Sequence, residues 1–207
     1  MIHKLPPAEI ERRSFEIIGE LLGDRALDPE KELVIKRVIH TTADFDYVDN
    51  LVFTEGAVAR GLEALRSGCD IVADTQMARA GINKRALAKL GGEVHCFISD
   101  PDVAREAGER GVTRAAVSME RAAKLEKPCI FAIGNAPTAL VALRELLDCG
   151  AVKPALIIGV PVGFVNVVES KELILEAGVP AIVARGRKGG SNVAAAVCNA
   201  LLYQLGR

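Results

Sequence analysis

Short, continuously apolar runs alternate along the chain with longer stretches of helical spacing. The apolar runs cover residues 51–53, 70–73, 94–98, 129–133, 155–160 and 181–184, and cores such as CIFAIG and ALIIGV carry no polar alternation. Strands that are apolar at every position are covered on both faces, as in a parallel sheet between two layers of helices. The pattern therefore predicts an α/β fold with a central sheet.

Helical stretches with recognisable ends fill the gaps between these runs. GAVARGLEALRSG ends at Gly68, PTALVALRELLDCG runs from Pro137 to Gly150, and KELILEAG ends at Gly178. Proline in the first turn and glycine just past the last turn are typical helix boundaries. Two more helices, over about 8–22 and 29–42, precede the first strand and form an N-terminal addition to the alternating pattern.

The final helical stretch, residues 191–205, reads SNVAAAVCNALLYQL and is apolar around most of its circumference. Such a helix needs more than one neighbour to cover it. Burial within the chain and a subunit interface both satisfy that requirement.

Composition indicates one soluble domain spanning residues 1–207, because no linker, repeat or low-complexity stretch interrupts the chain. Acidic and basic residues nearly cancel, 27 against 26, so we expect no nucleic acid partner and no binding to anionic membranes. No apolar run reaches the ~20 residues of a membrane span, and no secretion signal is recognisable, so we expect a cytoplasmic protein. The 5 cysteines lack CxxC spacing and should be mostly buried, without a metal site.

Glycine-containing loops follow the predicted strands, at residues 73–77, 134–138, 159–164 and 185–191. In an open parallel sheet, ligands bind beyond the carboxyl ends of the strands. RGRKGGS (185–191) lacks the spacing of nucleotide-binding motifs, and we expect an anion site there, built from Arg185, Lys188 and N–H groups near Ser191. A phosphate or nucleotide site and an ordinary strand-to-helix turn are the alternatives.

Asp74 follows a predicted strand, where it is either a helix N-cap or a substrate contact. Glu169 and Lys171 are expected to begin a solvated helix.

The three histidines differ in their sequence context. His3 lies in a terminus that we expect to be disordered, and His95 lies within a predicted strand as a core side chain with a partner. In PEKELVIKRVIH, Lys36, Arg37 and His40 share the polar side of a helix, which makes His40 a candidate proton donor. The opposite, inner stripe consists of Leu33, Val34, Ile35, Val38 and Ile39.

Five segments together carry a family resemblance: ERRSF, RVIH, GNAPTAL, VPVGFVNVVESKE and RGRKGGSNVAAA. They resemble the precorrin-8X methylmutase family, which includes the cobalt-precorrin-8 methylmutases of corrin-ring biosynthesis, from about residue 7 to residue 205. The resemblance implies a three-layer α/β/α sandwich of flavodoxin-like character, with a central, mainly parallel sheet. It also implies a homodimer with active sites at the interface, and no cofactor.

The activity implied by the resemblance is an isomerisation of a tetrapyrrole, precorrin-8 or cobalt-precorrin-8. A 1,5-sigmatropic shift moves a methyl group from C11 to C12, giving hydrogenobyrinic or cobyrinic acid. The family's catalytic histidine corresponds to His40, and its substrate-contacting serine and arginine correspond to Ser14 and Arg37. Further substrate contacts are expected at Asn135, Thr138, Gly163, Arg185, Lys188 and Ser191.

This substrate is a wide apolar ring edged by carboxylates, and it calls for a broad cleft with guanidinium and N–H groups at its rim. A rearrangement needs no external nucleophile, redox partner or protein-bound metal. This agrees with the sequence, in which no catalytic triad, metal-ligand cluster or nucleotide-binding motif is recognisable. Two other functions stay open on the sequence: a phosphate- or nucleotide-using α/β enzyme, and a non-catalytic tetrapyrrole carrier.

Overall fold

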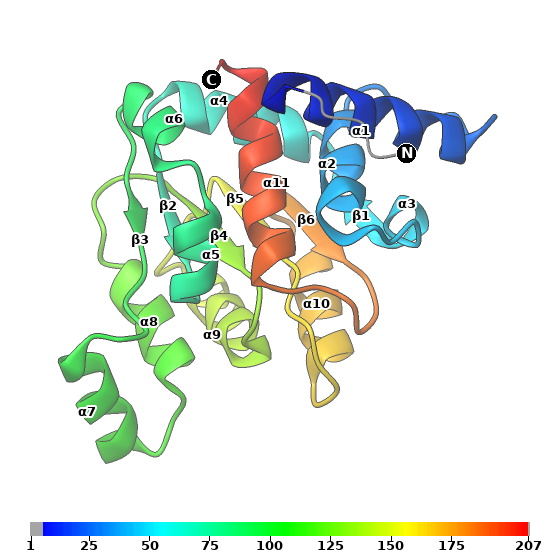
Figure 1. The fold of residues 1–207 in the computed structure, drawn as a ribbon. Helices are drawn as coiled ribbons and strands as arrows, with labels where there is room; N and C mark the ends of the chain where they lie inside the picture. Colours follow the sequence, from blue (N-terminus) through cyan, green and yellow to red (C-terminus); the bar gives the residue numbers. More distant parts are fainter. Residues whose placement is uncertain (1–5, 207) are drawn as a thin grey trace.

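A computed structural model describes residues 6–206 of the chain, with helices on both sides of a central sheet (Figure 1). The strands are β1 (Leu51–Phe53), β2 (Asp70–Ala73), β3 (Val94–His95), β4 (Cys129–Ile133), β5 (Leu156–Gly159) and β6 (Ala181–Ala184). The helices are α1 (Pro7–Leu22), α2 (Glu32–Thr42), α3 (Tyr47–Asn50), α4 (Ala57–Arg66), α5 (Gln76–Gly81), α6 (Lys84–Lys89), α7 (Pro101–Arg110), α8 (Arg114–Ala122), α9 (Pro137–Asp148), α10 (Val167–Leu175) and α11 (Ser191–Gln204).

The sheet has the strand order β1-β6-β5-β4-β2-β3. All neighbouring strands are parallel except β1, which pairs antiparallel with β6 at one edge. The five parallel strands follow the order second, first, third, fourth and fifth in the chain, which is the flavodoxin-like arrangement. The predicted fold class, including its mainly parallel sheet, is therefore confirmed.

Alternate residues of each central strand enter two separate cores. Residues such as Ile71, Ile130 and Ile158 pack with α2, α4 and α11, whereas Val72, Phe131 and Ile157 pack with α8 and α9. This division follows from the two-residue period of a strand. It explains why the central strands are apolar at every position.

The last helix is covered within the chain. α11 packs against α2, α4 and α5 and contacts the sheet at β4 and β5. Nine of its residues are buried, from Val193 to Leu202. Of the two expected ways of covering α11, burial within the chain is thus the one observed.

The element boundaries differ from prediction mainly at the margins. β3 ends at His95, so the predicted strand at 94–98 is too long, and the second helix begins at Glu32 instead of residue 29. Leu33 is exposed, in contrast to its predicted place in the inner stripe of α2. None of the helices within residues 6–206 combines the length and apolar character needed to cross a membrane.

Candidate functional site

The side chain of Phe15 on α1 joins two of the predicted site residues on α2. Its ring centroid lies 5.6 Å from that of the exposed His40 imidazole, with the planes inclined by 32°. The guanidinium carbon of Arg37 lies 4.8 Å from the same ring centroid. Because Arg37 and His40 are three residues apart on one helix, both reach the same side of α2. The N-terminal addition thus brings these two candidates together.

Arg37 is held at the junction of three helices. Its guanidinium also lies 5.1 Å from the Tyr203 ring of α11, and it forms an ion pair of 2.5 Å with Glu11 of α1. Its Nε is buried and has no hydrogen-bond partner within the described part of the chain. A buried N–H without an acceptor is costly, so the guanidinium is not fully satisfied by its pair with Glu11.

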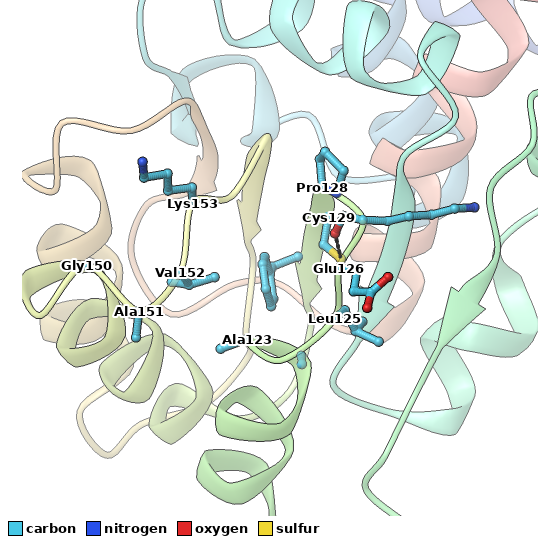
Figure 2. Close-up of a pocket in the computed structure, with 12 residues that line it drawn as sticks. Ala123, Leu125, Glu126, Pro128, Cys129, Gly150, Ala151, Val152 and Lys153 are labelled. Carbon is cyan, nitrogen blue, oxygen red and sulfur yellow. Dashed lines mark hydrogen bonds between the residues drawn. The ribbon is translucent and has the colours of Figure 1, made fainter.

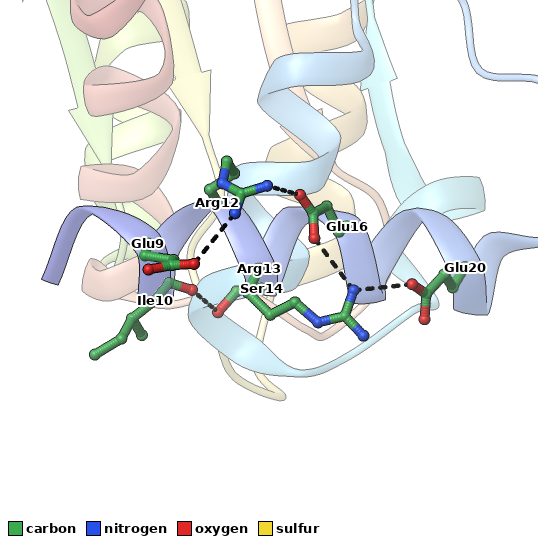
Figure 3. Close-up of polar contacts among 7 residues, drawn as sticks. All are labelled: Glu9, Ile10, Arg12, Arg13, Ser14, Glu16 and Glu20. Carbon is green, nitrogen blue, oxygen red and sulfur yellow. Dashed lines mark hydrogen bonds and ion pairs between the residues drawn. The ribbon is translucent and has the colours of Figure 1, made fainter. Parts of the chain in front are cut away.

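Ser14 is half-buried on α1, next to Phe15 in the sequence. Its hydroxyl donates to the Ile10 carbonyl at 2.8 Å, a hydrogen bond that Figure 3 marks with a dashed line. Arg12 and Arg13 form ion pairs with Glu16 on the same helix (Figure 3). Exposed pairs of this kind contribute little to stability, because water screens them. They stabilise α1 itself, whereas Ser14 and Phe15 lie beside the candidate site.

A pocket of about 220 Å³ lies beside Arg37 and is also lined by Phe15, Leu33 and Tyr203. Ligand pockets usually enclose about 300–1,000 Å³, so this one accommodates only an edge of a large ring. His40 is exposed and does not line it. The residues that the structure describes therefore do not form the expected broad cleft at this place.

Asp74 connects the ends of β2 and β4, where the strand order reverses. Its carboxylate accepts hydrogen bonds from the backbone N–H groups of Gly134, Asn135 and Ala136, at 2.9, 2.8 and 2.8 Å. Burial raises the pKa of this carboxyl, and the three N–H donors oppose that rise. Asp74 is only 1% exposed, so it fixes the 134–136 turn. This role replaces the direct substrate contact expected from the sequence, and Thr75, not Asp74, caps α5.

The neighbouring loops are closely packed at the same carboxyl ends of the strands. A side chain at Gly134 would come within 2.6 Å of the Ser191 Cα, and the Ser191 hydroxyl lies 2.8 Å from that of Thr75. The Thr113 hydroxyl donates to Thr138 at 2.9 Å. These contacts hold the loops close together at the carboxyl ends of the strands, which is where ligands bind in this fold class.

The 185–191 loop uses its two predicted anion-binding cations inside the chain. Lys188 Nζ lies 2.6 Å from carboxylate oxygens of Asp44 and Asp46, and Arg185 forms two hydrogen bonds with Glu172, at 2.8 and 3.0 Å. The hydrogen bond from Lys188 holds the pKa of Asp44 below its ordinary value. These pairings favour a structural turn over a phosphate or nucleotide site. They also join the loop to the segment that follows α2.

Gly163 belongs to the loop after β5 and is linked to the 185–191 loop. Its N–H donates to the Arg187 carbonyl at 3.2 Å, and its φ of 152° favours glycine. Asn135 and Thr138 are exposed at the neighbouring turn. The predicted residues therefore form two groups. Ser14, Arg37 and His40 lie on α1 and α2, and the others lie in the loops at the carboxyl ends of the strands. The ion pair between Lys188 and Asp44 connects the two groups.

A different pocket, of about 350 Å³, lies at the amino end of β4. Figure 2 shows the residues that line it. Its lining includes Leu125, Cys129, Phe131 and Val152, and none of the predicted site residues. Burial raises the pKa of the Cys129 thiol to about 11, so it is a poor nucleophile near neutral pH. The pocket lies at the amino ends of the parallel strands, whereas the loops described above lie at their carboxyl ends.

The partner predicted for His95 and the burial predicted for most cysteines are confirmed, although His95 itself is only half-buried. His95 Nε2 lies 3.0 Å from a carboxylate oxygen of the buried Asp70, which gives this histidine the expected partner. His3 lies outside the described residues. Four cysteines are buried and Cys149 is exposed. Among residues 6–206, no group of three His, Cys, Asp or Glu side chains is placed to hold a metal ion.

Four residues that shape the site are not predicted by the sequence patterns: Glu11, Phe15, Asp44 and Tyr203. Glu11 and Phe15 lie four residues apart on α1, and this spacing could have placed them on one face. No local signal links Tyr203 to Arg37, because the two helices meet only in the tertiary structure. The solvated helix start predicted for Lys171 is wrong, since this side chain is buried.

Comparisons with known proteins agree with this architecture. The profile of the family described as precorrin-8X methylmutase matches residues 9–204. The cobalt-precorrin-8 methylmutase of Salmonella typhimurium is 50% identical over 96% of each chain, and that of Priestia megaterium is 47% identical over 94% of this chain and 87% of its own. A crystal structure of precorrin-8X methyl mutase from Thermus thermophilus is 40% identical, with a TM-score of 0.86 over 94% of this chain and 96% of that chain. The chain therefore belongs to the precorrin-8X methylmutase family, a family of isomerases.

Proposed function

We propose that this protein is a methylmutase of cobalamin biosynthesis that acts on precorrin-8 or cobalt-precorrin-8. It moves a methyl group from C11 to C12 of the macrocycle and yields hydrogenobyrinic or cobyrinic acid. The proposal is supported by the names of the similar proteins and by a match that extends over nearly the whole chain.

His40 acts as the general acid in this proposal. It gives a proton to a pyrrole-type nitrogen or an adjoining carbon of the conjugated ring, and this lowers the barrier to migration. The bond from the methyl carbon to C11 breaks while its bond to C12 forms, the ring π electrons shift with it, and the proton returns to His40. Substrate and product are isomers, so no co-reactant is consumed.

The observation that carries this assignment is the shared contact of His40 and Arg37 with Phe15. The imidazole and the guanidinium lie on the same side of α2, which supports their proposed roles as proton donor and carboxylate-binding group. The guanidinium of Arg37, whose Nε has no acceptor among the described residues, is proposed to bind a peripheral carboxylate of the ring. Ser14, on the adjoining turn of α1, is then a further contact. Further substrate contacts are proposed in the loops at the carboxyl ends of the strands, at Asn135, Thr138, Gly163, Arg185, Lys188 and Ser191.

A second copy of the chain completes the substrate cleft in this proposal. Ile10, Ile17 and Leu21 are exposed on α1 at spacings of seven and four residues, and Ser14 lies on the same face. Contiguous apolar surface of this kind is typical of subunit interfaces. A homodimer built on α1 would enclose the exposed His40 and supply the missing wall.

The direct test is incubation of the purified protein with metal-free and cobalt-containing precorrin-8. The expected result is a changed absorption spectrum and a product of unchanged mass with the methyl group on C12. A carrier would bind the ring and leave its connectivity unchanged, and saturable binding of ATP or NADH would favour the nucleotide alternative.

His40→Ala should lower turnover at least ~100-fold and still bind the coloured ring. Near-normal turnover by this variant, or an equal loss in the His95→Gln control, would remove His40 from the mechanism.

A further inference from the structure

Lys171 on α10 is a buried cation that the reaction described above does not use. Its side chain is 0% exposed, and no carboxylate within the described part of the chain lies within ion-pair distance of its ammonium. Burial lowers the pKa of this lysine to about 8. Burying a charge without a counter-ion is costly, so an apolar side chain of similar size would suit the helix better. What the lysine adds is its hydrogen bonds.

Both hydrogen bonds of the Lys171 ammonium hold one loop. Its Nζ donates to the Gly186 carbonyl at 2.7 Å and to the Lys188 carbonyl at 2.9 Å. These carbonyls belong to the 185–191 loop, whose other end is fixed because the Gly190 N–H donates to the Val160 carbonyl at 2.8 Å. A side chain at Gly189 would collide with that same carbonyl, so the loop has little room to shift.

The 185–191 loop in turn forms ion pairs with the segment that follows α2, the helix that carries His40. The ammonium of Lys188 lies 2.6 Å from both Asp44 and Asp46. Asp44 follows His40 by four residues, and α2 ends between them at the left-handed Ala43, whose N–H donates to the Ile39 carbonyl at 2.7 Å. A displacement of Lys188 would therefore pull on the turn of α2 that sets the imidazole.

We propose that Lys171 is a positioning residue for the candidate site: it fixes the 186–188 backbone, and Lys188 transmits this position to Asp44 and the His40 end of α2. The proposal rests on the proposed function only in that His40 is the reactive group. Lys171 touches neither His40 nor the proposed substrate contacts on α1, and it acts through the loop.

The test uses the imidazole resonances of the full-length protein without substrate. The chain has 3 histidines, so the side-chain NMR signals can be assigned by substitution. Lys171→Met is expected to shift the His40 signals and leave those of His95, which pairs with Asp70 at the opposite edge of the sheet, in place. Lys188→Met interrupts the same connection at the surface and should also shift His40, even if the buried substitution impairs folding. Lys153→Met is the control, because this exposed lysine lies at the far end of the sheet.

Kinetics add a second readout. Lys171→Met should lower kcat/KM about tenfold, since small misplacements of a catalytic group are costly. Lys188→Met also removes a proposed substrate contact and should lower kcat/KM at least as much. The double variant should be no worse than the more impaired single variant, because both substitutions break one connection. His40 signals that stay in place in Lys188→Met or in folded Lys171→Met, or losses that multiply in the double variant, would overturn the proposal. Since the NMR experiment contains no substrate, its outcome is independent of whether His40 proves to be the acid.

Discussion

The ring of Phe15 lies 5.6 Å from the imidazole of His40, although the two residues belong to different helices. The same ring lies 4.8 Å from the guanidinium carbon of Arg37. Aromatic and cation–π contacts of this kind contribute about 0.5–1.5 kcal/mol each. One apolar side chain thus sets the orientation of both polar groups.

Phe15→Leu should therefore lower kcat/KM about five- to tenfold while keeping most of the apolar contact. The measurement is steady-state turnover of the corrinoid substrate, together with the free energy of unfolding. Phe97→Leu is a matched control, because Phe97 contacts a histidine and an arginine, His95 and Arg121, away from the site. Equal losses of activity in both variants would contradict a specific role for Phe15.

Asp74→Asn should lower the free energy of unfolding by about 3 kcal/mol, measured by urea denaturation. The carboxylate accepts three backbone N–H groups, whereas an amide offers one acceptor oxygen and turns its NH₂ group toward a donor. Asp148→Asn serves as the control, because this carboxylate is exposed and its pair with Arg144 should contribute less than about 1 kcal/mol. A loss below that level in Asp74→Asn would show that the 134–136 turn is held by other contacts.

Lys171 should make stability depend on pH in the alkaline range. Its pKa is about 8 in the folded chain, against 10.5 for an unperturbed lysine. Between these values unfolding takes up a proton, so the contribution of Lys171 to stability rises with pH from about 8 to 10.5, and the cost of burying the charge is fully present below pH 8. The stability difference between Lys171→Met and the unsubstituted protein should change by up to about 3 kcal/mol over this window. A constant difference across these pH values would contradict the shifted pKa.

Ile17→Glu should weaken the proposed homodimer and lower turnover with it. Ile17 is 40% exposed on the apolar face of α1, and a carboxylate there would be buried without a partner in the interface. Sedimentation velocity measures the association, and activity is followed over the same range of protein concentration. Val112→Glu provides an equally exposed control, also at 40%, at the end of the turn after α7. A monomeric unsubstituted protein, or an unchanged dimer in Ile17→Glu, would exclude this interface.

The sequence determined the α/β class and most strand positions, because burial on both faces leaves strands such as Cys129–Ile133 apolar at every residue. It also indicated Arg37 and His40 as neighbours, since three residues along a helix return to nearly the same side. These are local properties, in which a few consecutive residues carry the whole signal.

Only the tertiary structure decided which distant groups meet. Tyr203 contacts Arg37, and Lys188 forms an ion pair with Asp44. Each pair joins residues that are far apart in the sequence, so no helical or strand periodicity predicts it. Burial of Lys171 likewise depended on the loop that supplies its carbonyl acceptors. Whether a polar side chain is solvated or enclosed follows from the packing of whole elements, and this is why the roles of Asp74 and Lys171 emerged only in three dimensions.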